Sequence, residues 1–281
     1  MRIAILLHEN ERDQRLDRYY VTHLSRHWSE AGHDVVFVYG VAAFVPADIA
    51  IVHVNLSVVP EAYLDMAARY PIAINGRIRD IRKSRLSRNI VAPGDPWDGE
   101  VIVKSNLNYA GQPEQLLLRR LVGRRLGRRL SRLRSRLLRR PYFSAQSDYR
   151  IYDSSLAVPP VFFRDGRFVV EKFLPEREGD YYVIRNLHFL GDRLSGTRLL
   201  SRDRVITQQN IAESEREDPH PGIVRLRDSL GFDYGKFDYV IHKGDAVLID
   251  ANKTTGAENT SSPAKLERRR FMAEGLYSYL R

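Results

Sequence analysis

The sequence contains no cysteine, which excludes disulfides, thiol catalysis and metal sites built from thiolates. It also lacks any apolar run close to the ~20 residues that a membrane-spanning helix requires. The first 14 residues turn polar after five or six apolar positions, which is too short for a signal peptide and predicts a buried first strand. Together these absences predict a cytoplasmic protein.

Lysine is scarce, and the positive charge lies in one place. The net charge is +10, but residues 119–140 alone hold 11 arginines and no acidic residue. Outside this arginine-rich segment, 34 basic residues face 35 acidic ones, so the rest of the chain is nearly neutral. A fold that binds nucleic acid usually spreads its charge over a groove, so specific nucleic-acid binding is not expected.

The arginine-rich segment also carries leucines at helical spacing, which predicts a basic amphipathic helix. Three interpretations stay open. The helix could bind an anionic membrane surface, which would make the protein peripheral on the inner membrane surface. It could bind an acidic polymer or partner, or it could be a flexible, solvated insertion.

The first eighty residues alternate between short apolar runs and segments with helical spacing. Near-continuous apolar strands separated by helices predict a parallel sheet covered on both faces. Ligands of such sheets gather at the carboxyl ends of the strands. The predicted strands are 3–7, 35–39, 49–54 and 72–74, the predicted helices are 18–31 and 61–70, and the strand ends carry His8, Glu9, Asn10, Asn55 and Asn75.

The remainder of the chain has a different pattern of predicted elements, with several strands and few long helices, which indicates an α+β arrangement. A closing helix is predicted from Pro263 because proline is favoured in the first helical turn. The predicted strands are 100–104, 157–163, 168–173, 181–189, 237–241 and 246–250, and the closing helix spans 263–280.

The last two of these strands form a predicted hairpin with chemistry at its base. Asp238 begins one strand, Asp250 ends the other, and Asn252 lies two residues further on the same side of the chain. Two carboxylates and an amide oxygen make an oxygen-only site that suits Mg²⁺. The alternative is a surface hairpin with ordinary Asp and Asn turn residues.

Three further segments place charged residues at the ends of predicted elements. Lys83 lies where the α/β pattern of the first eighty residues ends and the α+β pattern begins. Lys104 ends one predicted strand, and Glu171 lies near the end of a later one. Arg185 lies on the strand after that. In this order, and together with the hairpin, the sequence resembles the ATP-grasp superfamily over roughly residues 75–256.

The resemblance implies an ATP-grasp fold, in which an α/β domain precedes two α+β lobes that clasp ATP. The preceding domain would span residues 1–82. The small ATP-binding lobe would span 83–173, with an arginine-rich insertion at 113–150. The large lobe, with the metal site, would span 174–281.

The resemblance also implies roles for single residues. Lys83 and Lys104 would contact the nucleotide phosphates, and Lys236 would stabilise the transferring phosphoryl group. Arg185 would bind an acyl phosphate or the substrate carboxylate. The hinge that holds the base would consist of Glu171, Lys172, Phe173 and Leu174. Glu178 would bind the ribose, and Ile249 would flank the nucleotide. Mg²⁺ would be bound by Asp238, Asp250 and Asn252.

The chain departs from the superfamily pattern at three points. Lys236 replaces an arginine, and Asp250 replaces a glutamate, which shortens the ligand by one methylene. No glycine-rich loop over the phosphates is evident, and residues 106–111 are the nearest candidate. Four of the 7 lysines nevertheless stand at or beside motif positions, where a compact ammonium is useful: Lys83, Lys104, Lys172 and Lys236.

The reaction that the resemblance implies is ATP-dependent ligation with ATP and Mg²⁺ as cofactors. A substrate carboxylate would form an acyl phosphate, and an amine would then displace phosphate. The partners would be small-molecule or peptide carboxylates and amines, held between the N-terminal strand ends and residues 254–256. The alternatives are a kinase-like phosphotransferase and a degenerate nucleotide-binding module that docks through its basic helix.

Overall fold

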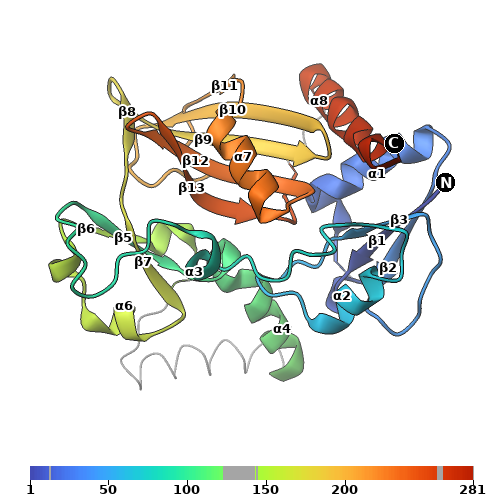
Figure 1. Ribbon diagram of the computed structural model, residues 1–281, viewed down its shortest axis with the longest axis horizontal. Coiled ribbons are helices and arrows are strands. Elements are labelled where there is room, and N and C mark those ends of the chain that lie inside the picture. The colour runs from blue at the N-terminus through green and yellow to red at the C-terminus, as the bar shows by residue number, and fades with distance from the viewer. Residues whose placement is uncertain (13, 123–142, 144, 258–261, 281) are drawn as a thin grey trace.

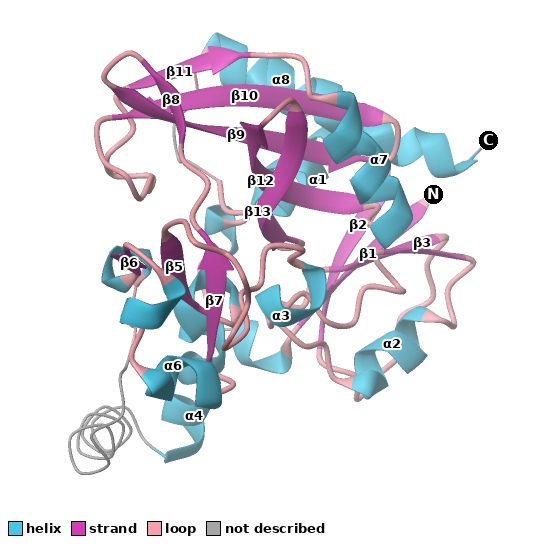
Figure 2. Ribbon diagram, turned by 60° about the vertical axis from the view of Figure 1, so that its left-hand side comes forward, coloured by secondary structure: helices cyan, strands magenta, loops and turns pink. Residues whose placement is uncertain are grey.

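The computed structural model describes residues 1–12, 14–122, 143, 145–257 and 262–280. Most of the arginine-rich segment, and therefore the predicted basic helix, lies outside these residues. Within them, three separate sheets form the framework (Figure 1; Figure 2). No helix in this part of the chain is long and apolar enough to span a membrane.

The N-terminal sheet is parallel and buried, as the sequence predicts. Its strands lie in the order β2-β1-β3-β4, with helices on both sides. The apolar residues of β1 face two hydrophobic clusters alternately, so that each face of the sheet is covered. The bounds are β1 (Arg2–Leu7), α1 (Tyr20–Glu30), β2 (Asp34–Tyr39), β3 (Ile49–Val52), α2 (Glu61–Ala67) and β4 (Ile72–Ile74).

The small sheet has three strands in the order β6-β5-β7 and forms its own core. Residues 157–163, predicted as a strand, instead end in α6, so this prediction was wrong. Pro160 has no N–H for a strand ladder but suits the first turn of a helix, which buries Phe162. The bounds are α3 (Lys83–Leu86), β5 (Val101–Ser105), α4 (Gln112–Val122), β6 (Arg150–Tyr152), α6 (Pro160–Arg164) and β7 (Phe168–Lys172).

The large sheet is antiparallel and contains the predicted hairpin, formed by β12 and β13. Helix α7 covers one face, where Ile223 packs against Leu187, Phe237 and Ala251. The bounds are β8 (Glu176–Glu178), β9 (Tyr181–Leu190), β10 (Arg193–Ser201), β11 (Glu213–Arg216), α7 (Pro221–Leu230), β12 (Tyr234–His242) and β13 (Asp245–Asn252).

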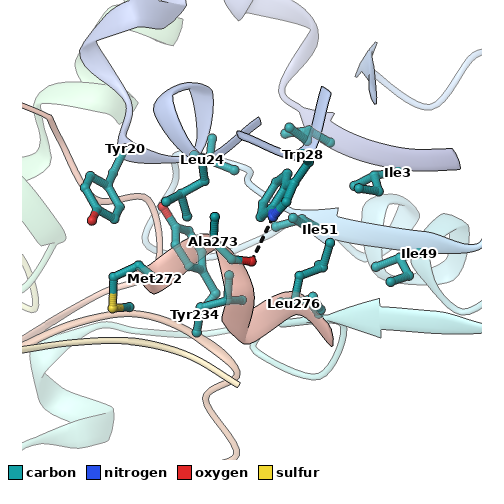
Figure 3. Packing of buried hydrophobic residues seen from close by; sticks show 14 of the residues in the cluster. Ile3, Tyr20, Leu24, Trp28, Ile49, Ile51, Tyr234, Met272, Ala273 and Leu276 are labelled. Carbon is teal, nitrogen blue, oxygen red and sulfur yellow. Dashed lines mark hydrogen bonds between the residues drawn. The ribbon is translucent and has the colours of Figure 1, made fainter. Parts of the chain in front are cut away.

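The C-terminal helix joins the large sheet to the N-terminal domain. The predicted helix over 263–280 is α8 (Pro263–Ala273) followed by a 3₁₀ segment, Glu274–Leu280. Helix α8 packs against α1, and the Trp28 Nε1 donates to the Ala273 carbonyl at 2.9 Å (Figure 3). Leu24, Met272 and Leu276 are fully buried in the same cluster. The two elements therefore share one core, although almost the whole chain separates them.

His53, which directly follows β3, is fully buried, and in the described part of the chain neither of its ring nitrogens has a hydrogen-bond partner. Burial lowers the pKa of His53 to about 3, from 6.5. Below about pH 6.5, His53 is therefore protonated in the unfolded chain but stays neutral in the folded chain. The free energy of unfolding consequently falls as the pH falls. Between pH 7 and pH 5, this histidine should cost about 2 kcal/mol of unfolding free energy. The His53→Leu variant should lose less stability over that interval in urea titrations; an equal loss in both proteins would contradict the prediction.

Candidate functional site

A cleft of about 1110 Å³ lies between the small sheet, the large sheet and the end of the N-terminal sheet. It exceeds the roughly 300–1,000 Å³ of a site for one small ligand. Eleven of the thirteen residues that the sequence predicts for the site line it, and Arg185 and Glu178 do not. The eleven are Lys83, Lys104, Glu171, Lys172, Phe173, Leu174, Lys236, Asp238, Ile249, Asp250 and Asn252.

The floor of the cleft is the face of the large sheet that α7 leaves uncovered. Three neighbouring strands each present two polar side chains there, because alternate residues of a strand share a face. The strand register aligns them in two rows that run across β9, β12 and β13. One row is Asn186, Asp238 and Asp250, and the other is His188, Lys236 and Asn252.

The two carboxylates on this floor fit a divalent cation. Asp238 and Asp250 are register partners on adjacent antiparallel strands, which brings their side chains close together. One oxygen of Asp238 accepts from Asn186 at 2.7 Å and lies 3.0 Å from the Lys236 ammonium. The second oxygen of each carboxylate has no hydrogen-bond partner among the described residues. Hard anionic oxygens with a neighbouring amide are the donor set that Mg²⁺ prefers.

Asn252 begins a loop that connects the floor to the N-terminal domain. Its Oδ1 accepts from the backbone N–H of Thr254 at 2.8 Å. The Thr254 hydroxyl in turn donates to the side-chain oxygen of Asn55 at 2.9 Å. Of the polar residues predicted at the N-terminal strand ends, Asn55 lines the cleft, whereas Asn75 is fully buried and bonds the backbone of Tyr234.

Two lysines reach the cleft from the opposite side. The Lys83 ammonium lies 2.9 Å from an Asp250 oxygen. Burial favours the neutral amine, but the Asp250 carboxylate outweighs it, and the pKa of Lys83 lies above its usual value. Lys104 pairs with Glu171 and also donates to the Ile249 carbonyl at 3.1 Å. Both lysines are therefore nearly buried, and each is paired with a carboxylate, between the small sheet and the large sheet.

The chain crosses from the small sheet to the large one at the predicted hinge. The Lys172 ammonium lies 4.9 Å from the centre of the Trp97 ring, and the Arg204 guanidinium lies 4.9 Å from that of Phe173. Cation–π contacts of this kind hold the connecting strand in place at the edge of the cleft.

Arg185 and Glu178 lie elsewhere. Arg185 belongs to the face of β9 that packs under α7, and it donates to Glu176 and, at 2.6 Å, to Glu217. Glu178 pairs with Arg198 on the exposed side of β8. Neither side chain lines the cleft, although Glu176, one partner of Arg185, does, so the structure does not bring Arg185 and Glu178 to the other predicted residues.

The candidate phosphate loop, residues 106–111, is partly structural. Asn106 bonds the backbone of Ser84 and Gly166, which fixes α3 against the small sheet. Asn108 and Tyr109 line one wall of the cleft. Tyr109 and Ala110 have φ angles of 51° and 54°, so the segment makes a tight left-handed turn rather than an extended cover.

Three further residues, not among those predicted from the sequence, lie at or behind the cleft. Asn186 and Tyr149 line it directly. Lys253 lies behind the floor, fully buried, and donates to the carbonyls of Val54 at 2.6 Å and Leu56 at 2.8 Å. Burial lowers the pKa of Lys253 to about 7. Strand alternation could have indicated Asn186. Lys253 depends on contacts between distant segments, and Tyr149 depends on the packing of its ring against Phe143 in the core of the small sheet.

Comparisons of the whole chain support the fold. No family model matches the sequence, and no curated protein matches it. Among solved structures, it is similar to a RimK domain ATP-grasp protein from Sphaerobacter thermophilus, with a TM-score of 0.52, 15% identity and 99% of each chain covered.

Two further solved structures have similar scores. One is the macrocyclase MdnC from Microcystis aeruginosa bound with its precursor peptide MdnA, with a TM-score of 0.53, 8% identity and coverage of 98% of this chain and 99% of that one. The other is a RiPP-associated ATP-grasp ligase from Chryseobacterium gregarium in complex with ADP and a leader and core peptide, with a TM-score of 0.52, 8% identity and coverage of 99% and 97%. The chain therefore has the fold of the ATP-grasp superfamily.

Proposed function

We propose that the protein is an ATP-dependent ligase that joins a carboxylate to an amine. One observation carries the proposal: two carboxylates on the floor of the cleft, Asp238 and Asp250, face lysines from both lobes. Phosphoryl transfer depends on positioning and on charge neutralisation, and this set of side chains supplies both. The predicted segments 1–82, 83–173 and 174–281 would act as the preceding domain, the small lobe and the large lobe.

Each group has a role in the proposed site. Lys83 and Lys104 would neutralise nucleotide phosphates from the small lobe, and Glu171 to Leu174 would hold the base. Asp238, Asp250 and Asn252 would hold Mg²⁺, which neutralises the charge that develops on the phosphates. Lys236, beside Asp238, would stabilise the phosphoryl group in transfer as a point charge. Arg185 and Glu178 have no role in this proposal.

The reaction would proceed in two steps. A substrate carboxylate oxygen attacks the γ-phosphorus, the bond from that phosphorus to the β–γ bridging oxygen breaks, and ADP leaves. The amine nitrogen then attacks the acyl carbon, phosphate leaves, and the nitrogen loses a proton to give the amide. The cleft continues past the floor to Asn55 and Thr254, where the second substrate would lie.

The partners would be a carboxylate and an amine, carried by small molecules or peptides. Two of the similar structures contain a bound peptide, and one of them also contains ADP. The size of the cleft in this chain supports a nucleotide together with a second ligand.

The first test is calorimetry of ATP binding with and without Mg²⁺. We expect micromolar affinity that depends on Mg²⁺, because the phosphates of ATP and the carboxylates of Asp238 and Asp250 would repel each other unless a divalent cation neutralised them. ADP formation is then measured with mixtures of carboxylates and amines. Dependence on an amine supports the ligase, whereas phosphorylation of a hydroxyl without an amine indicates a kinase. If the folded protein binds no ATP, both the ligase function and the kinase function are refuted.

A further inference from the structure

Tyr149 occupies a position in the cleft that the proposed function leaves unexplained. It follows a short 3₁₀ helix, Gln146–Asp148, and precedes β6 of the small lobe. Its ring packs against Phe143, with ring centres 5.9 Å apart, and belongs to the edge of the small-lobe core. The ring thus fixes the hydroxyl at the wall of the cleft.

The hydroxyl of Tyr149 is buried and has no hydrogen-bond partner among the residues that the structure describes. Burial raises the pKa of Tyr149 to about 12, so the phenol is neutral and carries a proton to donate at physiological pH. A buried hydroxyl that makes no hydrogen bond is unfavourable, and such groups in native structures usually await a ligand or an ordered water.

The groups around the hydroxyl indicate what it would meet. Lys83, Asp250 and Glu171 line the same cleft as Tyr149. Their charges are already engaged, because Asp250 pairs with Lys83 and Glu171 pairs with Lys104. A ligand oxygen that enters beside Lys83 would meet an ammonium and a phenol proton together, and both favour an anion.

We propose that Tyr149 donates a hydrogen bond to a phosphate oxygen of the bound nucleotide. This inference rests on the proposed function. It also assigns to the Tyr149 hydroxyl part of the phosphate binding that residues 106–111 do not provide. Tyr149 then acts beside Lys83: the lysine supplies charge without a fixed direction, and the phenol supplies a directed donor on a rigid ring.

The variant Tyr149→Phe tests the inference with the smallest possible change. It removes one oxygen and keeps the ring against Phe143. We expect Mg-ATP to bind about 10- to 100-fold more weakly, as for the loss of a hydrogen bond to a charged acceptor. Adenosine, which lacks phosphate, should bind the variant and the wild type equally. The melting temperature should not fall, because no hydrogen bond of the free protein is lost.

The matched control is Tyr152→Phe, three residues further in the same lobe and outside the cleft lining. It should leave Mg-ATP affinity unchanged. Equal Mg-ATP affinities of wild type and Tyr149→Phe would overturn the inference, and so would an equal weakening of adenosine and Mg-ATP, which would indicate a distorted lobe.

The same titrations separate this inference from the proposed function. If the folded wild type binds no Mg-ATP, the nucleotide site is refuted, and the role of Tyr149 is refuted with it. If the wild type binds Mg-ATP and Tyr149→Phe does so equally well, only the role of Tyr149 is refuted.

Discussion

The Asp250→Asn variant should lose Mg²⁺-dependent ATP binding and, at the same time, about 3–5 kcal/mol of unfolding free energy. The first loss follows because asparagine supplies a neutral ligand in place of a carboxylate. The second follows because the nearly buried ammonium of Lys83 lies 2.9 Å from Asp250 and would lose its counter-charge. Calorimetry and urea titrations measure the two effects separately.

Asp238→Asn separates the metal effect from the stability effect. Lys236, its partner, has a side chain 27% exposed, against 5% for Lys83, so water can solvate it. We expect Mg-ATP affinity to fall about 100-fold, or about 3 kcal/mol, with a change in stability below about 1 kcal/mol. Unchanged dependence on Mg²⁺ would contradict the assignment of Asp238 as a metal ligand.

Two further proteins complete this series. Asp245→Asn removes a carboxylate from the exposed start of the same strand, β13, and should change neither property. Lys83→Met combined with Asp250→Asn should regain stability relative to Asp250→Asn alone, because it removes the uncompensated charge. It should not regain ATP binding.

The Lys253→Met variant has the second large expected effect. It removes the one donor to the Leu56 carbonyl among the described residues, and this orphaned acceptor should cost about 1–3 kcal/mol. The Val54 carbonyl also loses the lysine but keeps the backbone N–H of Leu56, which donates to it at 2.9 Å. Since Lys253 lies between Asn252 and Thr254, the loop should also shift relative to the floor. A shift of about 1 Å in a reacting group can cost about 100-fold in rate.

The measurements for Lys253→Met are urea titration and the rate of ADP formation with an accepted substrate pair. Lys243→Met, in the exposed turn between β12 and β13, is the matched control and should behave as the wild type. If Lys253→Met has wild-type stability and rate, the buried lysine does not position the loop.

Strand alternation accounts both for the success and for one failure of the sequence analysis. It placed Asp250 and Asn252 correctly on one face, since a hairpin fixes the register of both strands. Applied to β9, the same rule groups Arg185 with Leu187 and Phe189, which are core residues, and leaves Asn186 on the cleft face. The resemblance to the ATP-grasp superfamily favoured Arg185, whereas the alternation of the strand favours Asn186.

Other features were beyond any local pattern. Lys253 bonds carbonyls 199 and 197 residues away, and nothing in its own segment indicates those partners. Tyr149 reaches the cleft because its ring packs on Phe143, which is a property of the assembled lobe. The apolar content of residues 157–163 suggested a strand. Pro159 and Pro160 instead favour the start of a helix at this point.

The shared core of α1 and α8 has a consequence for the stiffness of the molecule. It unites the N-terminal sheet and the large sheet, whereas the small lobe has a separate core that includes Val101, Phe143 and Phe168. Thermal motion that widens the cleft therefore displaces the small lobe against an otherwise continuous body. Such motion would strain the contacts that bridge the small lobe and the large sheet, among them the ion pair of Lys83 with Asp250. The residues proposed to bind phosphate are thus also those that limit how far the free protein opens.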